Sequence, residues 1–355
     1  MTSLRAALVT PLTGPLAPFG QACATGLSLW ARHAAHLPPP WVGVDLDVRD
    51  IGSDVRASMR AALNDHPDLL FGPYGSHTML AAARSCERVI WNHSGATSRL
   101  ALPEFPQVIN VLSPASTYFT GVLEAVRAFD PGAATVALFH TTSGFGRDVA
   151  TGAANAAVSL KFEVEFVAFE PGHAAEAASL VPHADILLVA GSFADECAAA
   201  PGLLERAWRA AAFVGAGVEE VLVSLGNRRE GLLGPAQWIA SAAPEPDEGP
   251  DADWFVKRYG AVAGGEPPYP AAQAFAAGLL CARCLRDSGR CEDTAQLAAA
   301  YQLVCTTLYG SFRINALNGL QSGHQILIVQ WQNGRRRVVW PPEQAERPLI
   351  LPLSR

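Results

Sequence analysis

ILIVQWQNGRRRVVW, residues 326–340, is the stretch of this 355-residue chain that decides its fold. Two apolar runs, 326–331 and 337–340, flank Asn333-Gly334, and an Asn-Gly pair in this setting predicts a β-hairpin. Before the hairpin, helices without an intervening strand are expected over 254–259, 271–287 and 294–305. Helices followed by a hairpin do not suit two domains joined end to end. They indicate a chain that crosses between two lobes more than once.

Upstream of these helices, short apolar strands alternate with helical stretches. The strands expected in the first half are 4–10, 42–49, 69–71, 89–91 and 108–111. A second run of the same kind has strands at 135–140, 163–169, 186–190 and either 221–224 or 212–214. Strands and helices in this order build parallel sheets with helices on both faces. We therefore predict an α/β fold of two doubly wound parallel-sheet lobes, with candidate crossings at 113–116 and 244–250.

Charge and hydropathy exclude two classes of function. The net charge is −7, and the basic residues are scattered except for Arg335-Arg336-Arg337. Nucleic-acid binding needs clustered Lys and Arg to neutralise phosphates, so it is not expected. No apolar run reaches the roughly 18 residues of a membrane span, so membrane insertion is not expected either. The chain begins directly in its first strand without a signal-peptide pattern, which leaves two alternatives: a cytoplasmic protein, or one whose export signal was removed.

The seven cysteines predict neither a disulfide framework nor a metal site. Their number is odd and their spacings are irregular, which favours a reducing compartment. Cys281 and Cys284 form a Cys-x-x-Cys pair, but it lies in a predicted helix and no second pair follows. We expect no metal and no cofactor.

Several motifs resemble the leucine/isoleucine/valine-binding family of ABC transporter receptors. They occur in the order in which that family has them and extend over nearly the whole chain. They are the loop 11–20, the segment 71–78, the Ser-Gly-Phe-Gly-Arg-Asp at 143–148, and the tail from Tyr309 to Pro341. The tail is the most specific of the four.

The resemblance implies a type I periplasmic-binding fold, in which three crossings join two α/β lobes and the ligand is enclosed between them. The N-terminal lobe would hold residues 1–118 and 246–322. The C-terminal lobe would hold 119–245 and 323–355. This arrangement explains why helices and then a hairpin end the chain.

Ligands of open α/β sheets bind beyond the carboxyl ends of the strands, near helix N-termini that attract anions. Ser76 follows a predicted strand and should open a helix, where its hydroxyl and the nearby amides would hold a carboxylate or carbonyl. The alternative is a plain helix N-cap. Ser94, Gly95 and Ala96 lie in the next strand-end loop, where the resemblance implies backbone contacts to the ligand.

The other ligand-binding candidates are aromatic or polar residues at strand ends and crossings. Phe145 stands where the family often has Tyr, which removes a hydroxyl, and Trp238 has core packing as an equal alternative. His77 and His93 are expected to be polar groups rather than catalysts. The remaining candidates in this set are Phe19, Tyr74, His77, Trp91, Tyr118, Ser192, Phe193, Ala216 and Gln237.

One departure from the family bears on the ligand. The amino-acid binders carry a Glu after a second-lobe strand, where it pairs with the ligand ammonium. Here Gly215-Ala216-Gly217 stands at that point, and Glu219 and Glu220 are expected to begin a helix. An unpaired buried ammonium is costly, so a carboxylate, amide or aromatic acid is the expected ligand.

No nucleophile elbow, Walker A loop or strand-anchored Gly-x-Gly-x-x-Gly occurs, and we do not expect an enzyme. We predict a receptor that captures a small organic ligand by hinge closure and presents it to an ABC permease, periplasmic if an export signal was trimmed. The alternative is a cytoplasmic regulator, because residues 74–78 resemble the amide-sensing regulator of an amidase operon. If the protein associates with itself, we expect a weak homodimer.

Overall fold

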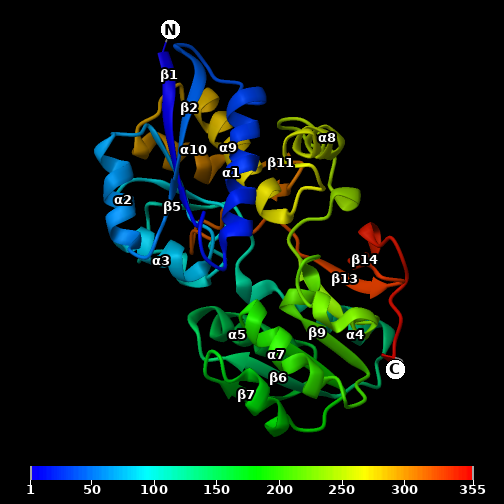
Figure 1. Ribbon diagram of the computed structural model, residues 1–355. Helices are drawn as coiled ribbons and strands as arrows, with labels where there is room; N and C mark the ends of the chain where they lie inside the picture. Colours follow the sequence, from blue (N-terminus) through cyan, green and yellow to red (C-terminus); the bar gives the residue numbers. More distant parts are fainter. Residues whose placement is uncertain (1, 354–355) are drawn as a thin grey trace. The chain divides into compact units, whose positions relative to one another are not determined.

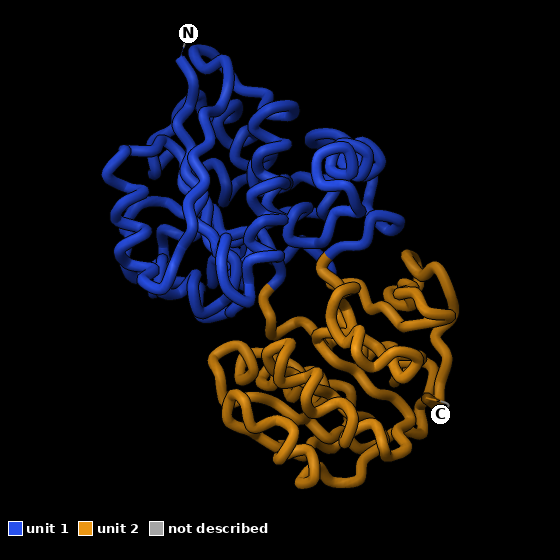
Figure 2. Tube along the Cα trace, in the orientation of Figure 1, with its two compact units in different colours: residues 1–113, 238–325 blue, residues 114–237, 326–355 orange. Residues whose placement is uncertain are grey.

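The computed structural model describes residues 2–353 and divides the chain into two compact units (Figures 1 and 2). Unit 1 comprises Met1–Ser113 and Trp238–Gln325, and unit 2 comprises Pro114–Gln237 and Ile326–Arg355. The chain thus crosses three times, as predicted, but after Ser113, Gln237 and Gln325 rather than after 118, 245 and 322. The Pro-rich segment 244–250 belongs to unit 1, because the amides of Asp247 and Glu248 both donate to the Thr306 carbonyl, at 2.9 and 3.0 Å.

Unit 1 contains a five-stranded sheet in the order β2-β1-β3-β4-β5, and every pair is parallel. β1 lies between β2 and β3 and pairs with both, so that Leu8 is opposite Val48 of β2 and Phe71 of β3. The parallel order brings the carboxyl ends of the strands to one edge of the sheet. The strands are β1 (Thr2–Thr10), β2 (Trp41–Asp50), β3 (Leu69–Gly72), β4 (Ile90–Asn92) and β5 (Val108–Asn110).

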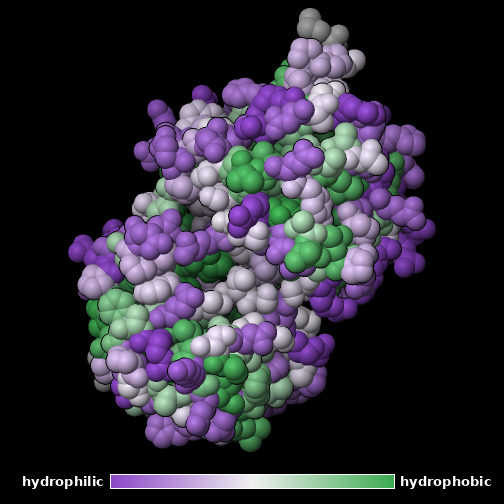
Figure 3. Space-filling view, turned by 180° about the vertical axis from the view of Figure 1, so that it is seen from behind, coloured by the Kyte–Doolittle hydropathy of each residue, from purple (hydrophilic) through white to green (hydrophobic). Residues whose placement is uncertain are grey.

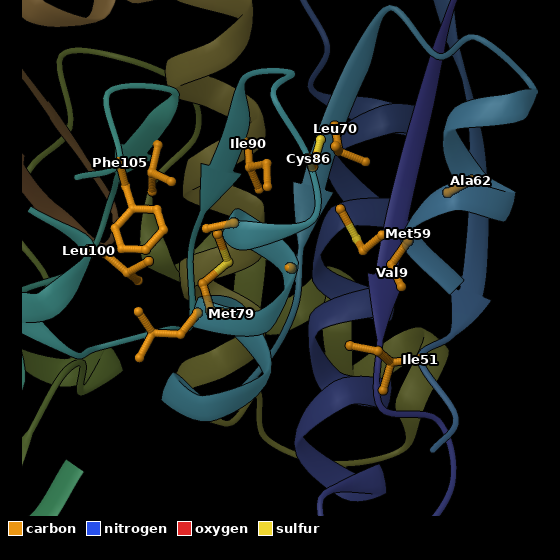
Figure 4. Close-up of a cluster of buried hydrophobic side chains, with 14 of the residues drawn as sticks. Val9, Ile51, Met59, Ala62, Leu70, Met79, Cys86, Ile90, Leu100 and Phe105 are labelled. Atoms are coloured by element: carbon orange, nitrogen blue, oxygen red, sulfur yellow. The ribbon is translucent and has the colours of Figure 1, made fainter. Parts of the chain in front are cut away.

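Helices α2 (Val55–Asn64) and α3 (Ser76–Arg84) cover one face of this sheet. Because successive strand side chains point to opposite faces, Val9 of β1 and Leu70 of β3 share the face that packs on these helices. Figure 4 shows them with Met59 of α2 and Met79 of α3 in one cluster of buried side chains. This cluster is the core beneath the two helices.

Helices from two distant parts of the chain cover the other face: α1 (Ala17–His33), α9 (Tyr269–Ser288) and α10 (Asp293–Gln302). Trp30 of α1 packs on Phe71 of β3, with ring centroids 5.8 Å apart. α1 and α9 touch through glycines. A Cβ on Gly26 would lie 2.1 Å from the Ala271 carbonyl oxygen, and one on Gly278 would lie 2.2 Å from the Trp30 ring. Unit 1 also contains α8 (Ala252–Ala263) and the short antiparallel pair β11 (Cys305–Thr307) and β12 (Gly310–Phe312).

Unit 2 contains a seven-stranded sheet in the order β14-β13-β10-β9-β8-β6-β7. Pairing is parallel from β10 to β7 and antiparallel where β13 joins β10 and β14. Its helices are α4 (Thr120–Phe129), α5 (Gly144–Ser159), α6 (Ala174–Ala177) and α7 (Phe193–Leu203). The strands are β6 (Thr135–Thr141), β7 (Glu163–Phe169), β8 (Ile186–Ala190), β9 (Ala210–Phe213), β10 (Leu233–Ala236), β13 (Leu327–Gln332) and β14 (Arg335–Trp340). The α/β prediction with parallel sheets and a terminal hairpin is confirmed.

The hairpin of β13 and β14 has the turn that its sequence predicts. Asn333 has φ 55° and Gly334 has φ 73°, and positive φ at both central residues is what a type I′ turn requires. The carboxylate of Glu230 accepts hydrogen bonds from both turn amides, at 2.8 and 2.5 Å. The turn therefore reverses the chain and is itself fixed to unit 2.

The structure resolves the open alternative at 205–225 and adds one strand. Residues 210–213 form β9, whereas 223–229 form a 3₁₀ helix, so the strand prediction at 221–224 is wrong. β10 escaped prediction because it contains Gly234 and Pro235, residues that disfavour an interior strand. Gly234 is needed there: a Cβ would lie 2.2 Å from the Gly217 amide nitrogen.

The surface is mixed in hydropathy. Figure 3 shows hydrophilic and hydrophobic residues interspersed over the visible face. Among residues 2–353, no helix combines the length and the apolar composition that crossing a membrane would take.

The α1–α9 contact gives a test of the packing. Gly26→Ala should lower the free energy of unfolding by about 1–3 kcal/mol, because its Cβ meets a backbone carbonyl that cannot move alone. Gly260→Ala is the matched control: it too lies in a helix, and its Cβ finds only the Gly265 carbonyl at 3.5 Å. Urea titration of both variants measures the difference, and equal stabilities would contradict the packing described.

Candidate functional site

The carboxyl edge of the unit 1 sheet carries an open helix N-terminus. α3 begins at Ser76, four residues after β3 ends, and its N-cap Gly75 has φ 99° and no side chain to cap the helix. The Gly75 amide donates to the Ser94 carbonyl at 3.2 Å. Ser76 is thus the first helical residue rather than the N-cap, and its hydroxyl bonds to no other residue within 2–353. The first amides of a helix have no acceptor within it, so this end offers donors to an anion.

Aromatic side chains adjoin this helix end. Phe19, in the first turn of α1, stacks on Tyr74 with ring centroids 5.0 Å apart and planes 8° from parallel. The hydroxyl oxygens of Tyr74 and Tyr269 lie 2.5 Å apart. Tyr269, the first residue of α9, was not among the predicted site residues. His77, by contrast, is exposed.

The loop after β4 is held together from inside by Asn92. The side-chain oxygen Oδ1 of Asn92 accepts hydrogen bonds from the backbone amides of Ser94 and Gly95, at 3.3 and 2.7 Å. Its amide nitrogen donates to the Gly95 carbonyl at 2.9 Å and to Asn110 at 2.8 Å. The Ser94 and Gly95 amides that were predicted to face a ligand are therefore engaged by the protein. Ala96, buried in the same loop, has no such bond to Asn92.

The side chain of Ser94 is also engaged. Its hydroxyl lies 2.6 Å from Nδ1 of His93 and 3.4 Å from the thiol of Cys23. His93 is fully buried, and burial lowers its pKa to about 3. Burial likewise raises the pKa of the Cys23 thiol to about 12. The three residues form a neutral buried cluster behind the loop.

Two predicted tryptophans lie in the core of unit 1. Trp91 of β4 is fully buried, and its indole N–H donates to Gln296 of α10 at 2.8 Å. Trp238 donates to the Leu308 carbonyl at 2.9 Å and packs edge-on against Phe255, with centroids 6.0 Å apart. For Trp238 the structure favours the core-packing alternative.

Three predicted residues come together in unit 2. Tyr118, which follows a 3₁₀ turn at Ala115–Thr117, accepts a hydrogen bond at its hydroxyl from the Gln237 amide at 2.9 Å. Its ring meets Phe145, at the start of α5, edge-on at 6.1 Å. Burial raises the pKa of Tyr118 to about 12, so the phenol is neutral.

The other unit 2 candidates serve local structure. Ser192 is the N-cap of α7; its hydroxyl donates to the Asp195 carboxylate at 2.7 Å and accepts from the Asp195 amide at 3.1 Å. Phe193, the first residue of α7, is half-buried. Ala216 is fully buried in the 3₁₀ helix Val214–Gly217, and its carbonyl accepts from the Trp331 indole at 2.9 Å.

Glu196, a fully buried acid of α7, was not among the predicted site residues. One carboxyl oxygen accepts from the Gly191 amide at 3.2 Å and the other from the Gly215 amide at 2.7 Å. Burial raises its pKa to about 8 against the opposing effect of these hydrogen bonds. An acid in the first turn of a helix is ordinarily explained by the helix dipole, so only the fold reveals this role.

Metal-ligating residues do not gather in the described part of the chain. Residues 2–353 contain no group of three or more His, Cys, Asp or Glu side chains placed to hold an ion. Cys281 and Cys284 are buried in α9, where burial raises the pKa of both thiols.

The buried imidazole of His93 predicts a pH dependence of stability. Its folded pKa of about 3 lies below the roughly 6.5 of an unfolded histidine, so its contribution is complete above pH 6.5 and is lost as pH falls towards 3. His93→Asn should therefore flatten the fall in unfolding free energy over this range, measured by urea titration at several pH values. His36→Asn, at an exposed histidine, is the control. Parallel pH curves for wild type and His93→Asn would contradict the assignment.

Solved structures that share this fold are solute-binding proteins. One from R. palustris, in complex with benzoate, is 16% identical, with a TM-score of 0.75 over 95% of this chain and 96% of its own. A leucine-binding protein from Thermotoga maritima is 18% identical, with a TM-score of 0.77 over 94% and 97%. One from Rhodopseudomonas palustris BisB5, in complex with 3,4-dihydroxybenzoic acid, is 16% identical, with a TM-score of 0.76 over 94% and 95%. At these identities the likeness establishes the fold.

The sequence profile of one family, described as periplasmic binding protein, matches residues 3–336 and thus most of the chain. This match confirms the family that the motifs predicted, and with it the prediction of a small-molecule solute-binding protein. It does not favour the alternative of a cytoplasmic regulator. The chain belongs to the periplasmic binding protein family.

Proposed function

We propose that this protein captures a small organic carboxylate with a flat apolar body and presents it to an ABC permease. The observation that carries the proposal is the uncapped N-terminus of α3, with the unbonded Ser76 hydroxyl, beside the stacked rings of Phe19 and Tyr74. The solved relatives that bind benzoate and 3,4-dihydroxybenzoic acid support the same ligand class.

The polar end of such a ligand suits α3. Gly75 contributes no side chain that would occupy the first-turn amides, and its own amide is already bonded to Ser94. The amides of Ser76 and His77 and the Ser76 hydroxyl remain as donors. Charge-assisted hydrogen bonds of this kind, together with the helix dipole, bind a carboxylate without a lysine or arginine.

The apolar end suits an aromatic surface. Unit 1 offers the Phe19–Tyr74 stack next to the first turn of α3. Aromatic rings in stacked or edge-on pairs add about 0.5–1.5 kcal/mol beyond the area that they bury. An aromatic acid would make use of this stabilisation, and a short aliphatic acid would not.

An α-amino acid fits less well, because its ammonium lacks a partner at the loop after β9. Residues 215–217 carry no carboxylate, and the nearby Glu196 is buried with both oxygens bonded to backbone amides. Glu219 forms an ion pair with Arg336 at 2.8 Å. A desolvated ammonium without a counter-charge costs several kcal/mol.

A thermal-shift panel tests the ligand class. Benzoate and 4-hydroxybenzoate should raise the unfolding midpoint, because a ligand that binds only the folded form stabilises it by about 2.7 kcal/mol at a hundred times its Kd. Acetate, benzamide and leucine complete the panel. A shift with leucine alone would contradict the ammonium argument, and no shift with any aromatic acid would contradict the proposal.

Ser76→Ala tests the place of binding. Loss of a hydrogen bond to a charged oxygen should weaken benzoate binding by about tenfold or more, measured by isothermal titration calorimetry. Ser53→Ala removes the hydroxyl of an exposed serine away from α3 and should leave the Kd unchanged. Equal affinities for wild type and Ser76→Ala would place the carboxylate elsewhere.

A further inference from the structure

Glu196 accepts hydrogen bonds from backbone amides outside its own helix, which its place in the first turn of α7 does not require. It is the fourth residue of α7, it is fully buried, and no cationic side chain within residues 2–353 forms an ion pair with it. Burying a carboxyl group without a counter-charge is unfavourable, and such a group persists where hydrogen bonds compensate. The compensation here comes entirely from backbone amides.

These amides belong to two neighbouring strand ends of unit 2. β8 ends at Ala190, immediately before Gly191, and β9 ends at Phe213, two residues before Gly215. Oε1 of Glu196 accepts from the Gly191 amide at 3.2 Å and Oε2 accepts from the Gly215 amide at 2.7 Å. One carboxyl group therefore joins the loops that follow two adjacent parallel strands.

The loops are shaped for this contact. A Cβ on Gly215 would lie 2.8 Å from Oε2 of Glu196 and 2.5 Å from Cγ1 of Val221, so a side chain there would displace the carboxyl group. A Cβ on Gly191 would lie 3.1 Å from Cβ of Asp195 and 3.2 Å from the Phe169 ring. Glycine at both positions lets the amides approach the acid.

We propose that Glu196 is a positioning residue for the carboxyl edge of unit 2, and that it fixes the loops at 191–193 and 214–216 by bonding one amide from each. The proposal that Glu196 fixes the two loops rests on its hydrogen bonds alone. Its consequence for ligand affinity rests on the proposed function. A change at Glu196 would act through the loops rather than through contact with the ligand.

The contact depends on pH because of what surrounds the acid. The ionisable group that faces it is Asp195 on its own helix; Asp195 accepts from the Gly172 amide at 2.8 Å and adds like charge. The residues that bond to Glu196 from the loops after β8 and β9 are Gly191, Gly215 and Val214, and all three do so through uncharged backbone amides. Burial raises the pKa of Glu196 from its ordinary value of 4.5 to about 8, so the group is mostly protonated at pH 7. When the loops open, water reaches the carboxyl group and its pKa returns towards 4.5. Rising pH therefore favours the open loops between about pH 4.5 and 8 and has no further effect above 8.

Hydrogen–deuterium exchange of the ligand-free protein is the direct test. In Glu196→Gln the carboxamide NH₂ faces one of the two amide donors, so protection should fall by about tenfold at that glycine, Gly191 or Gly215, the size expected when a buried amide loses its acceptor. Protection elsewhere in unit 2 should not change. Glu220→Gln, at an exposed acid, is the matched control. Unchanged protection at both glycines would overturn the proposal.

A pH series makes the test independent of folding of the variant. In the wild type, protection factors at Gly191 and Gly215, corrected for intrinsic exchange, should fall as pH rises from about 4.5 to 8 and level off above 8, and in Glu196→Gln they should stay flat. A flat wild-type profile would overturn the proposal even if the variant does not fold. Benzoate affinity, measured over the same pH range, should follow protection in the wild type only. Absence of benzoate binding with the exchange result intact would count against the proposed function and not against Glu196.

Discussion

The first parallel sheet has two faces to bury, and the first 113 residues supply helices for little more than one of them. α2 and α3 cover one face, while α1 needs α9 beside it to cover the other. Gly26 and Gly278 allow this pair to approach closely, and α9 is buried over nearly its whole length, from Pro270 to Leu285. The chain must therefore return from unit 2 to complete unit 1. The return after Gln237 follows from this requirement, and the third crossing, after Gln325, lets the hairpin complete the second sheet.

Both sheets solve the same problem at their carboxyl edges. A loop after a buried strand has backbone amides that need acceptors, and in each unit one buried side chain accepts two of them: Asn92 in unit 1 and Glu196 in unit 2. A glycine provides one of the two donors to Asn92, and glycines provide both donors to Glu196. Loops held in this way keep their shape without ligand, which lowers the entropic cost of ordering them on binding.

The sequence was informative wherever a pattern depended on local chemistry. Alternation and turn residues predicted the strands around Leu8 and Leu188, and Asn333-Gly334 predicted the hairpin. β10 escaped because tertiary pairing overrides the poor propensity of Gly234 and Pro235. At the site, Ser76 was placed at a helix start and Tyr118, Phe145 and Gln237 were selected together. What a sequence could not supply is the partner of each polar group: Asn92 for the Ser94 and Gly95 amides, Asp195 for Ser192, Leu308 for Trp238, and the two glycines for Glu196.

Burial determines the charge of the ionisable residues near the carboxyl edges of the two sheets. His93 has a pKa of about 3, Glu196 of about 8 and Tyr118 of about 12, and burial is the main cause of all three shifts. At pH 7 the imidazole and the phenol are therefore neutral and the acid is mostly so. None of the three offers a counter-charge, and the α3 N-terminus would meet the charge of a ligand with dipoles. Dipoles of that sign favour an anion, and the absence of a carboxylate at 215–217 disfavours a cation. The same neutral surroundings thus argue for a simple acid over a zwitterion.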